Sequence, residues 1–337
     1  MKSIFVDCNK ELAPVFARVR RSDDPPITIH GDPFQSADLP RLLKGYDICL
    51  DDHSYMPTAA MEQCRGLRHI VFLGTGASSY MDVPALKGLG IEVHTIKGYG
   101  DIAVAEHTMA LIFACCRDLA RMDRAVRAGT WDPPESMQLN GKTLGVVGLG
   151  GIGMEVVRIA RGVGMQVIAW NRTPRTDAAL ASEASGQRGH SMDARAGHSP
   201  EGGSSARAGV PLVALDDLLA RADVISLHLA LNAETRGLID AQRLALTKPG
   251  VILVNTARGE LVDEAALLDG LRSGHIRHAG LDVFHAEPLK ADHPLARMDN
   301  VTLTSHAAYR TLEASETLMR RAIDIVRTIV ERESASP

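Results

Sequence analysis

One segment constrains the fold of this chain more than any other: a short apolar run, a glycine-rich turn and a helical pattern follow one another without a gap. The run Thr143–Val147 leads into Gly148-Leu149-Gly150-Gly151-Ile152-Gly153, and a second apolar run, Gln166–Trp170, comes after the helical pattern. This is the spacing GxGxxG in the strand–turn–helix setting of dinucleotide-binding folds. The residues predicted to bind the pyrophosphate of a dinucleotide are Gly148, Gly150, Gly151, Ile152 and Gly153.

Each glycine has a physical reason in such a turn. Gly148 permits the tight turn, Gly150 lets the backbone approach a pyrophosphate, and Gly153 allows the helix to pack closely on the strand. The N-terminus of the following helix offers free N–H groups and a partial positive charge to the phosphates.

The end of the second strand predicts which dinucleotide is bound. In NAD-binding folds an acidic residue here accepts a hydrogen bond from the ribose 2′-hydroxyl. This chain has Asn171, Arg172 and Thr173 instead, so no carboxylate repels a 2′-phosphate and Arg172 can pair with one. We expect all three residues to contact the cofactor, with NADP(H) preferred. Arg172 could also stack on adenine or face solvent, in which case NAD(H) is accepted.

Composition excludes several classes of protein. The 337 residues carry a net charge of −4 with both signs interspersed, which does not favour nucleic acid or an acidic membrane surface. Charges appear too early for a signal peptide, and the longest apolar stretch, residues 109–116, is too short to cross a bilayer. The five cysteines lack CxxC spacing, so we expect reduced thiols in a cytoplasmic protein.

Short apolar runs alternate with helical patterns along the chain, which predicts parallel sheets covered by helices. One helix is predicted from Asp101 to a stop at Gly129; at 1.5 Å per residue it would be about 40 Å long and could bridge two domains. Residues 181–209 are rich in Gly, Ser, Ala and Arg, which predicts a flexible surface insertion. The predicted strands are 3–7, 47–50, 69–73, 91–95, 143–147, 166–170, 224–227, 251–255, 278–281 and 301–304.

Three later segments each place a reactive side chain just after a predicted strand. Arg258 follows the run ending at Asn255, Glu287 comes after Gly280-Leu281-Asp282, and His306 ends the segment that begins at Val301. Because ligands of open α/β sheets bind at the carboxyl ends of strands, we expect the three groups to converge.

These ordered motifs closely resemble the D-isomer-specific 2-hydroxyacid dehydrogenases, a family that includes D-lactate and D-3-phosphoglycerate dehydrogenases and hydroxypyruvate reductases. The match runs from about Leu67 to His306 and includes Gly74-Thr75-Gly76, Val104-Ala105-Glu106-His107 and Asn255-Thr256-Ala257-Arg258-Gly259. The resemblance implies two Rossmann-like α/β domains with a cleft between them. Residues 1–98 and 288–337 would form a discontinuous, flavodoxin-like substrate domain, and residues 99–287 a doubly wound dinucleotide-binding domain.

The resemblance also implies roles for the matching residues. Arg258 would hold the substrate carboxylate and polarise the 2-oxo group, and Thr75 and Gly76 would receive that carboxylate on their backbone N–H groups. His306 would give a proton to the carbonyl oxygen, while Glu287 favours the charged form of its imidazole. Thr256 is assigned to the cofactor site, where Asp282 would orient the nicotinamide carboxamide.

The chain departs from the family at two places, and several questions stay open. Ser305 replaces a usual proline, which could loosen the turn that aims His306, and the acidic ribose-binding residue is absent. Glu287 argues against a formate dehydrogenase. A phosphite dehydrogenase or a non-enzymatic, NAD(H)-sensing corepressor remains an alternative. The identity of the 2-oxo acid is open, a homodimer is expected from the family, and the spacing of His275, His278 and His285 predicts no metal site.

Overall fold

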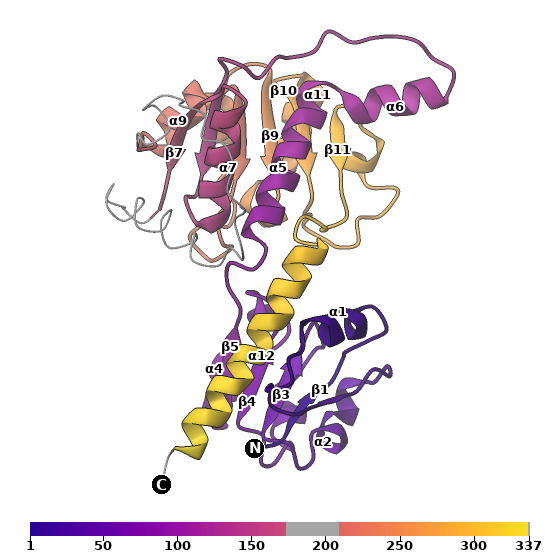
Figure 1. The fold of residues 1–337 in the computed structure, drawn as a ribbon. Coiled ribbons are helices and arrows are strands. Elements are labelled where there is room, and N and C mark those ends of the chain that lie inside the picture. Colours follow the sequence, from indigo (N-terminus) through magenta and orange to yellow (C-terminus); the bar gives the residue numbers. More distant parts are fainter. Residues whose placement is uncertain (173–208, 336–337) are drawn as a thin grey trace, which may run out of the picture. The chain divides into compact units, whose positions relative to one another are not determined.

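The computed structural model describes residues 1–172 and 209–335 (Figure 1). Thr173 and residues 181–208 of the predicted insertion lie outside the described residues. The chain forms two compact units, one of Met1–Gly100 with Arg310–Pro337 and one of Asp101–Tyr309. Each unit contains a parallel sheet with helices, which confirms the predicted α/β class.

The first unit is built on a sheet whose described strands follow the order β2-β1-β3-β4-β5. This is the flavodoxin-like order, in which every strand runs parallel to its neighbours. Its strands are β1 (Ser3–Phe5), β2 (Ile27–Ile29), β3 (Ile48–Asp51), β4 (His69–Phe72) and β5 (Glu92–Thr95). Its helices are α1 (Leu12–Val19), α2 (Leu39–Leu42), α3 (Thr58–Met61), α4 (Val83–Gly88) and α12 (Leu312–Ser334).

Alternating side chains of these strands fill two cores. Ile4, Ile70 and Phe72 pack with residues of α2, α3 and α4 on one face. Val71 and Leu73 pack on the other face with α1 and with the apolar side of α12. The C-terminal helix therefore completes the core of the N-terminal segment.

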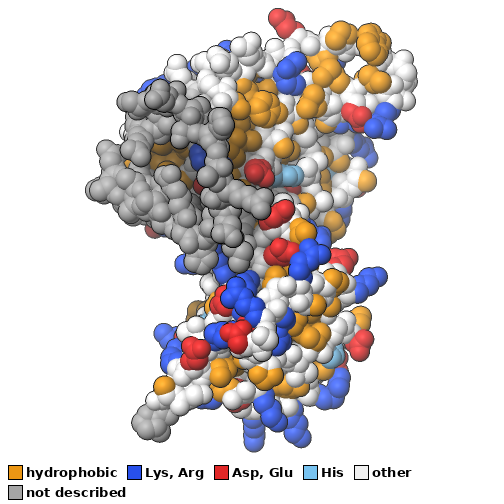
Figure 2. Space-filling model, in the orientation of Figure 1, with side chains coloured by type: hydrophobic (Ala, Val, Ile, Leu, Met, Phe, Trp, Pro, Cys, Tyr) orange, Lys and Arg blue, Asp and Glu red, His pale blue; other side chains and the backbone are white. Residues whose placement is uncertain are grey.

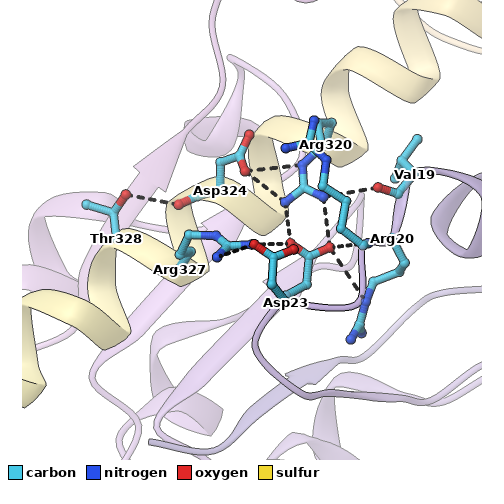
Figure 3. A network of polar contacts seen from close by, with 9 residues as sticks. Val19, Arg20, Asp23, Arg320, Asp324, Arg327 and Thr328 are labelled. Carbon is cyan, nitrogen blue, oxygen red and sulfur yellow. Dashed lines mark hydrogen bonds and ion pairs between the residues drawn. The ribbon is translucent and has the colours of Figure 1, made fainter.

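A buried carboxylate ties α12 to the loop after α1 (Figure 3). Asp24 has no exposed side-chain surface and accepts hydrogen bonds from both terminal nitrogens of Arg320, at 2.8 and 2.7 Å. Arg327 donates to the same carboxylate at 2.7 Å. These hydrogen bonds, led by Arg320, hold the pKa of Asp24 far below its usual value.

The second unit contains a larger sheet, whose described strands follow the order β11-β10-β9-β8-β6-β7. A parallel bridge between Ala169 and Leu212 adds a further extended segment beside β7, which completes the doubly wound order. The strands are β6 (Thr143–Val147), β7 (Gln166–Trp170), β8 (Val224–Leu227), β9 (Val251–Asn255), β10 (Ile276–Leu281) and β11 (Val301–Leu303). The helices are α5 (Asp101–Cys116), α6 (Leu119–Arg127), α7 (Gly151–Gly162), α9 (Leu215–Arg221), α10 (Ala241–Leu246) and α11 (Glu264–Ser273).

Helices cover both faces of this sheet. α5 and α7 pack on one face, and α9, α10 and α11 pack on the other. Among residues 1–172 and 209–335, no helix has the length and apolar content that crossing a bilayer requires.

The structure differs from the sequence-based prediction in three places. β2 was not predicted, because only Ile27 of its three residues is buried and two prolines precede it. The single helix predicted from Asp101 is wrong: α5 and α6 are separate, with Asp118 between them at φ +50°. Asp118 contacts the Nδ1 atom of His278 on β10 at 3.2 Å, and this contact fixes the break. The third difference is the domain boundary: residues 288–309, predicted for the first domain, group with the second unit, since β11 pairs with β10.

Candidate active site

The three predicted catalytic side chains lie in the Asp101–Tyr309 unit, after the carboxyl ends of neighbouring strands. Arg258 follows β9, Glu287 follows β10 and His306 follows β11. These strands are adjacent in the sheet, in the order β9-β10-β11. The fold thus gathers the three segments at one edge of the sheet, where ligands of such folds bind.

His306 and Glu287 form a close pair. The Nδ1 atom of His306 lies 2.7 Å from Oε2 of Glu287, and both side chains are somewhat over one-third exposed. The backbone N–H of Phe284 donates to the other carboxylate oxygen of Glu287 at 2.9 Å. Glu287 is therefore oriented by the chain before it, and it leaves the Nε2 atom of His306 as the second functional nitrogen of the ring.

A buried aspartate holds the turn that carries His306. The carboxylate of Asp282 accepts hydrogen bonds from the hydroxyl of Thr304 at 2.6 Å and from the N–H groups of Ala307 and Ala308, each at 3.0 Å. The N–H of His306 itself donates to the Asp282 carbonyl oxygen at 2.8 Å. These contacts support the left-handed backbone of His306, at φ +52°, which a non-glycine residue rarely adopts. Hydrogen bonds to Asp282 therefore fix the turn both before and after Ser305, at Thr304 and at His306.

The segment with Arg258 is packed against the segment with Glu287. A Cβ atom at Gly259 would collide with the backbone of Phe284 and His285, so only glycine allows this approach. The side chain of Asn255 fixes the same loop, because its Nδ2 donates to the Arg258 carbonyl oxygen at 2.8 Å. The guanidinium of Arg258 is partly buried and donates to the Ala257 carbonyl oxygen at 2.6 Å.

The glycine turn adopts the predicted geometry at the point where the strand order reverses, between β6 and β8. Gly148 has φ +107°, and a Cβ there would lie 2.7 Å from the carbonyl oxygen of His228, just after β8. A Cβ at Gly153 would collide with the Gly148 carbonyl, and one at Gly151 would collide with the Asp101 carboxylate. Gly150 caps α7 and faces open space. The open space at Gly150 fits the close approach of a pyrophosphate to backbone N–H groups, whereas the other three glycines allow close packing within the chain.

The residues at the end of β7 have partners in the structure. The side-chain oxygen of Asn171 accepts a hydrogen bond from Leu149 at 3.1 Å, so Asn171 supports the glycine turn itself. Arg172 donates to the carboxylate of Glu234 at 2.6 Å, in an ion pair in which both side chains are well exposed. Thr173 lies outside the described residues.

The remaining predicted site residues have the following surroundings. The hydroxyls of Thr256 and Thr108 are 2.8 Å apart in the second unit. The side chain of Asp282 has no exposed surface, since the His306 turn uses its carboxylate. Thr75 and Gly76 belong to the first unit; they follow the carboxyl end of β4, and Thr75 is exposed.

Two polar residues near these groups, Thr304 and Glu234, were not predicted from the sequence. Thr304 contacts both Asp282 and the Nε2 atom of His107, the latter at 3.0 Å. Glu234 is the partner of Arg172 described above. Each joins segments far apart in the chain, so the spacing of residues alone gives no signal for it.

Comparisons with known proteins find one matching family model and several related proteins. The family model for the D-isomer specific 2-hydroxyacid dehydrogenase NAD binding domain matches residues 109–199 and 194–308, which is more than half of the chain. A hydroxypyruvate reductase from Blautia hydrogenotrophica is 32% identical over 286 residues, covering 82% of this chain and 80% of its own length.

Two further proteins are similar to this chain, one by sequence and one by structure. A D-3-phosphoglycerate dehydrogenase from Mycobacterium leprae is 39% identical over 265 residues. The aligned region is 78% of this chain but 44% of that protein, so the chain matches less than half of this relative. An acyclic imino acid reductase, solved with NADPH and D-Arg, superposes with a TM-score of 0.79 at 27% identity over 98% of both chains.

Proposed function

Since this chain belongs to the D-isomer specific 2-hydroxyacid dehydrogenase family, we propose that it reduces a small 2-oxo acid to the D-2-hydroxy acid with a nicotinamide cofactor. The observation that carries this proposal is the His306–Glu287 pair, placed beside the Arg258 segment at the carboxyl edge of a dinucleotide-binding sheet. A hydroxypyruvate reductase among the relatives supports a short 2-oxo acid as the substrate.

Each site residue has a separate role in the proposed reaction. When bound, the nicotinamide supplies a hydride to the carbonyl carbon. Arg258 holds the substrate carboxylate with its planar donor fork and polarises the 2-oxo group. His306 gives the proton on its Nε2 atom to the carbonyl oxygen, and the Glu287 carboxylate stabilises the imidazolium through Nδ1. The backbone N–H groups of Thr75 and Gly76 are proposed to bind the substrate carboxylate.

The cofactor is proposed to lie along the glycine turn, with its pyrophosphate at the N-terminus of α7 beside Gly150 and Ile152. Thr256 and Asp282 stay proposed cofactor residues; Asp282 would act from a buried position, through the turn that it holds. The imino acid reductase solved with NADPH supports a phosphorylated cofactor. We propose NADP(H) as the preferred cofactor because Arg172 replaces the usual acidic position.

Oxidation of NADPH and NADH by glyoxylate, hydroxypyruvate, pyruvate and phenylpyruvate tests the proposed activity. We expect turnover with at least one of these acids, with His306 as the proton donor. Cofactor binding without turnover of any 2-oxo acid would contradict the proposal. Turnover of phosphite, or cofactor-dependent binding of a protein partner, would then identify the alternative chemistry.

The Arg172–Glu234 pair is expected to set the choice of cofactor. Arg172→Ala removes the cation that faces a 2′-phosphate, so the KM for NADPH should rise about tenfold while the KM for NADH changes little. Glu234→Gln removes the carboxylate that competes for Arg172, so kcat/KM with NADPH should rise relative to kcat/KM with NADH. Steady-state kinetics with both cofactors measures the two effects.

The matched control for these variants is Arg272→Ala, which removes an exposed arginine that pairs locally with Asp269 on α11. It should leave the ratio of the two cofactors unchanged. Equal losses with NADPH and NADH in Arg172→Ala would assign Arg172 to adenine or to structure.

We further propose a cytoplasmic homodimer. All five cysteines lie in the described part of the chain and are free, buried thiols, as reducing compartments favour. Large apolar side chains are exposed along α6 and the segment after it, among them Leu119, Val126 and Trp131, the last 86% exposed. Figure 2 shows hydrophobic side chains gathered in that region, at the top of the view. Light scattering that gives the mass of a single chain would contradict the dimer.

A further inference from the structure

Three potential metal ligands lie together on the sheet of the unit that contains residues 1–100. His69 is the first residue of β4, Glu92 is the first residue of β5, and His94 lies two residues further along β5. The parallel register places His69 opposite Glu92, and side chains two residues apart on a strand point to the same face. The sheet itself therefore brings the two imidazoles and the carboxylate together.

The distances among the three donor atoms match a metal site. The Nδ1 atom of His69 lies 3.2 Å from Nε2 of His94 and 3.5 Å from Oε2 of Glu92, and the last two atoms are 3.7 Å apart. A point equidistant from three such atoms lies about 2.0 Å from each, which is the usual length of Zn–N and Zn–O bonds. We propose that His69, Glu92 and His94 bind a divalent first-row transition ion of the zinc class.

The side-chain types of these three residues suit metal coordination. An imidazole in its neutral form can offer the lone pair of one ring nitrogen to a metal ion. Two imidazoles and one carboxylate are a known zinc ligand set that leaves a fourth position for water.

Burial differs among the ligands in a way that permits an ion to enter. The side chain of His69 is only 6% exposed and that of His94 is 18% exposed, so the rings are held by packing. Glu92 is 53% exposed and forms the solvent side of the cluster. An ion can therefore reach the two ring nitrogens from the solvent side of the cluster, where Glu92 lies.

An arginine of α12 competes for the same site. Arg332 donates to Oε2 of Glu92 at 3.1 Å, the oxygen that also faces the two imidazoles. Arg332 lies near Glu333 as well, and Glu333 accepts a hydrogen bond from Arg68 at 2.6 Å. A bound dication would be repelled by Arg332, so removing this side chain should tighten metal binding rather than weaken it.

The position of the cluster separates it from the proposed catalysis. His69 and Glu92 stand at the amino ends of their strands, whereas Thr75 and Gly76 follow the carboxyl end of β4. The ion would pin the edge strand β5 to β4 and stabilise the folded unit. Its loss should change stability without changing the chemistry assigned to His306.

Calorimetric titration of the full chain with Zn²⁺ tests the site, with Mg²⁺ as the oxygen-seeking comparison. We expect a Zn²⁺ site that His94→Ala and Glu92→Gln each weaken by more than about tenfold, the least that loss of a supporting partner costs a metal site. Arg332→Ala should bind Zn²⁺ more tightly than the unaltered chain. Zn²⁺, but not Mg²⁺, should raise the melting temperature of the unaltered chain and not that of His94→Ala.

His30→Ala is the matched control, because it removes a histidine of the same unit that lies outside the cluster. It should leave the Zn²⁺ affinity unchanged. Equal Zn²⁺ affinity in the unaltered chain, His94→Ala and Glu92→Gln would overturn the proposal, as would weaker binding in Arg332→Ala. These readouts do not depend on 2-oxo acid turnover, so they stand whether or not the proposed activity is found.

Discussion

His306→Ala and Arg258→Ala each lower kcat/KM for reduction of the 2-oxo acid by about 10²–10⁴-fold, the range for loss of a general acid or of a charged group that stabilises the transition state. His306 is the proton donor of the proposed reaction, and Arg258 is the cation that meets the carboxylate and the polarised carbonyl oxygen. The measurement is steady-state kinetics with the preferred 2-oxo acid and cofactor.

Additional variants separate chemistry from folding. Arg272→Ala, on the surface of α11, should keep normal turnover. Glu287→Gln keeps the shape of the side chain but removes the charge 2.7 Å from the imidazole. It should reduce kcat, because the imidazolium loses its stabilising partner. Near-normal turnover in His306→Ala or Arg258→Ala would remove the assigned role.

Asp24→Ala lowers the free energy of unfolding of the first unit by about 3–5 kcal/mol, the cost of removing one partner from a buried ion pair. The carboxylate of Asp24 is fully buried and is the shared acceptor for Arg320 and Arg327, so its loss leaves these two cations of α12 without their central partner. Urea denaturation followed by circular dichroism measures the loss, and hydrogen exchange in α12 locates it.

The pH dependence of the same contact has a definite sign. The pKa of Asp24 is lower in the folded than in the unfolded chain, so its stabilisation is fully present above the unfolded pKa of about 3.9. It is lost as pH falls below that value, and Asp24→Asn should lack this acid-dependent component. The matched control is Asp23→Ala, since Asp23 also pairs with Arg327 but its side chain is 68% exposed. Equal losses in the two alanine variants would contradict the role of burial.

Much of the fold could be predicted because it follows from patterns of neighbouring residues in the sequence. The glycine turn from Gly148 to Gly153 lies between β6 and α7 as its spacing requires. The segments with Arg258, Glu287 and His306 could be placed at one edge because parallel strands share a carboxyl end. By contrast, β2 has only one buried residue, so its pattern resembles a loop.

Long-range contacts explain what could not be predicted. The break between α5 and α6 depends on a contact from Asp118 to His278, 160 residues away. The partnership of Asp282 with Thr304, and that of Arg172 with Glu234, likewise join separate segments. The expectation that no metal site exists considered histidines near one another in the sequence, whereas the proposed ligands come from neighbouring strands. Pairing register, which sequence spacing alone does not reveal, brings such groups together.

The most direct test of the proposed reaction follows the hydride itself. The reduced cofactor, deuterated at the transferred position of the nicotinamide, is incubated with the enzyme and the preferred 2-oxo acid, and the product is analysed by mass spectrometry and chiral chromatography. We predict one deuterium on the carbon that bears the new hydroxyl, in the D-enantiomer, and no such product with His306→Ala on the same timescale. An unlabelled product, or a labelled L-enantiomer, would contradict the account.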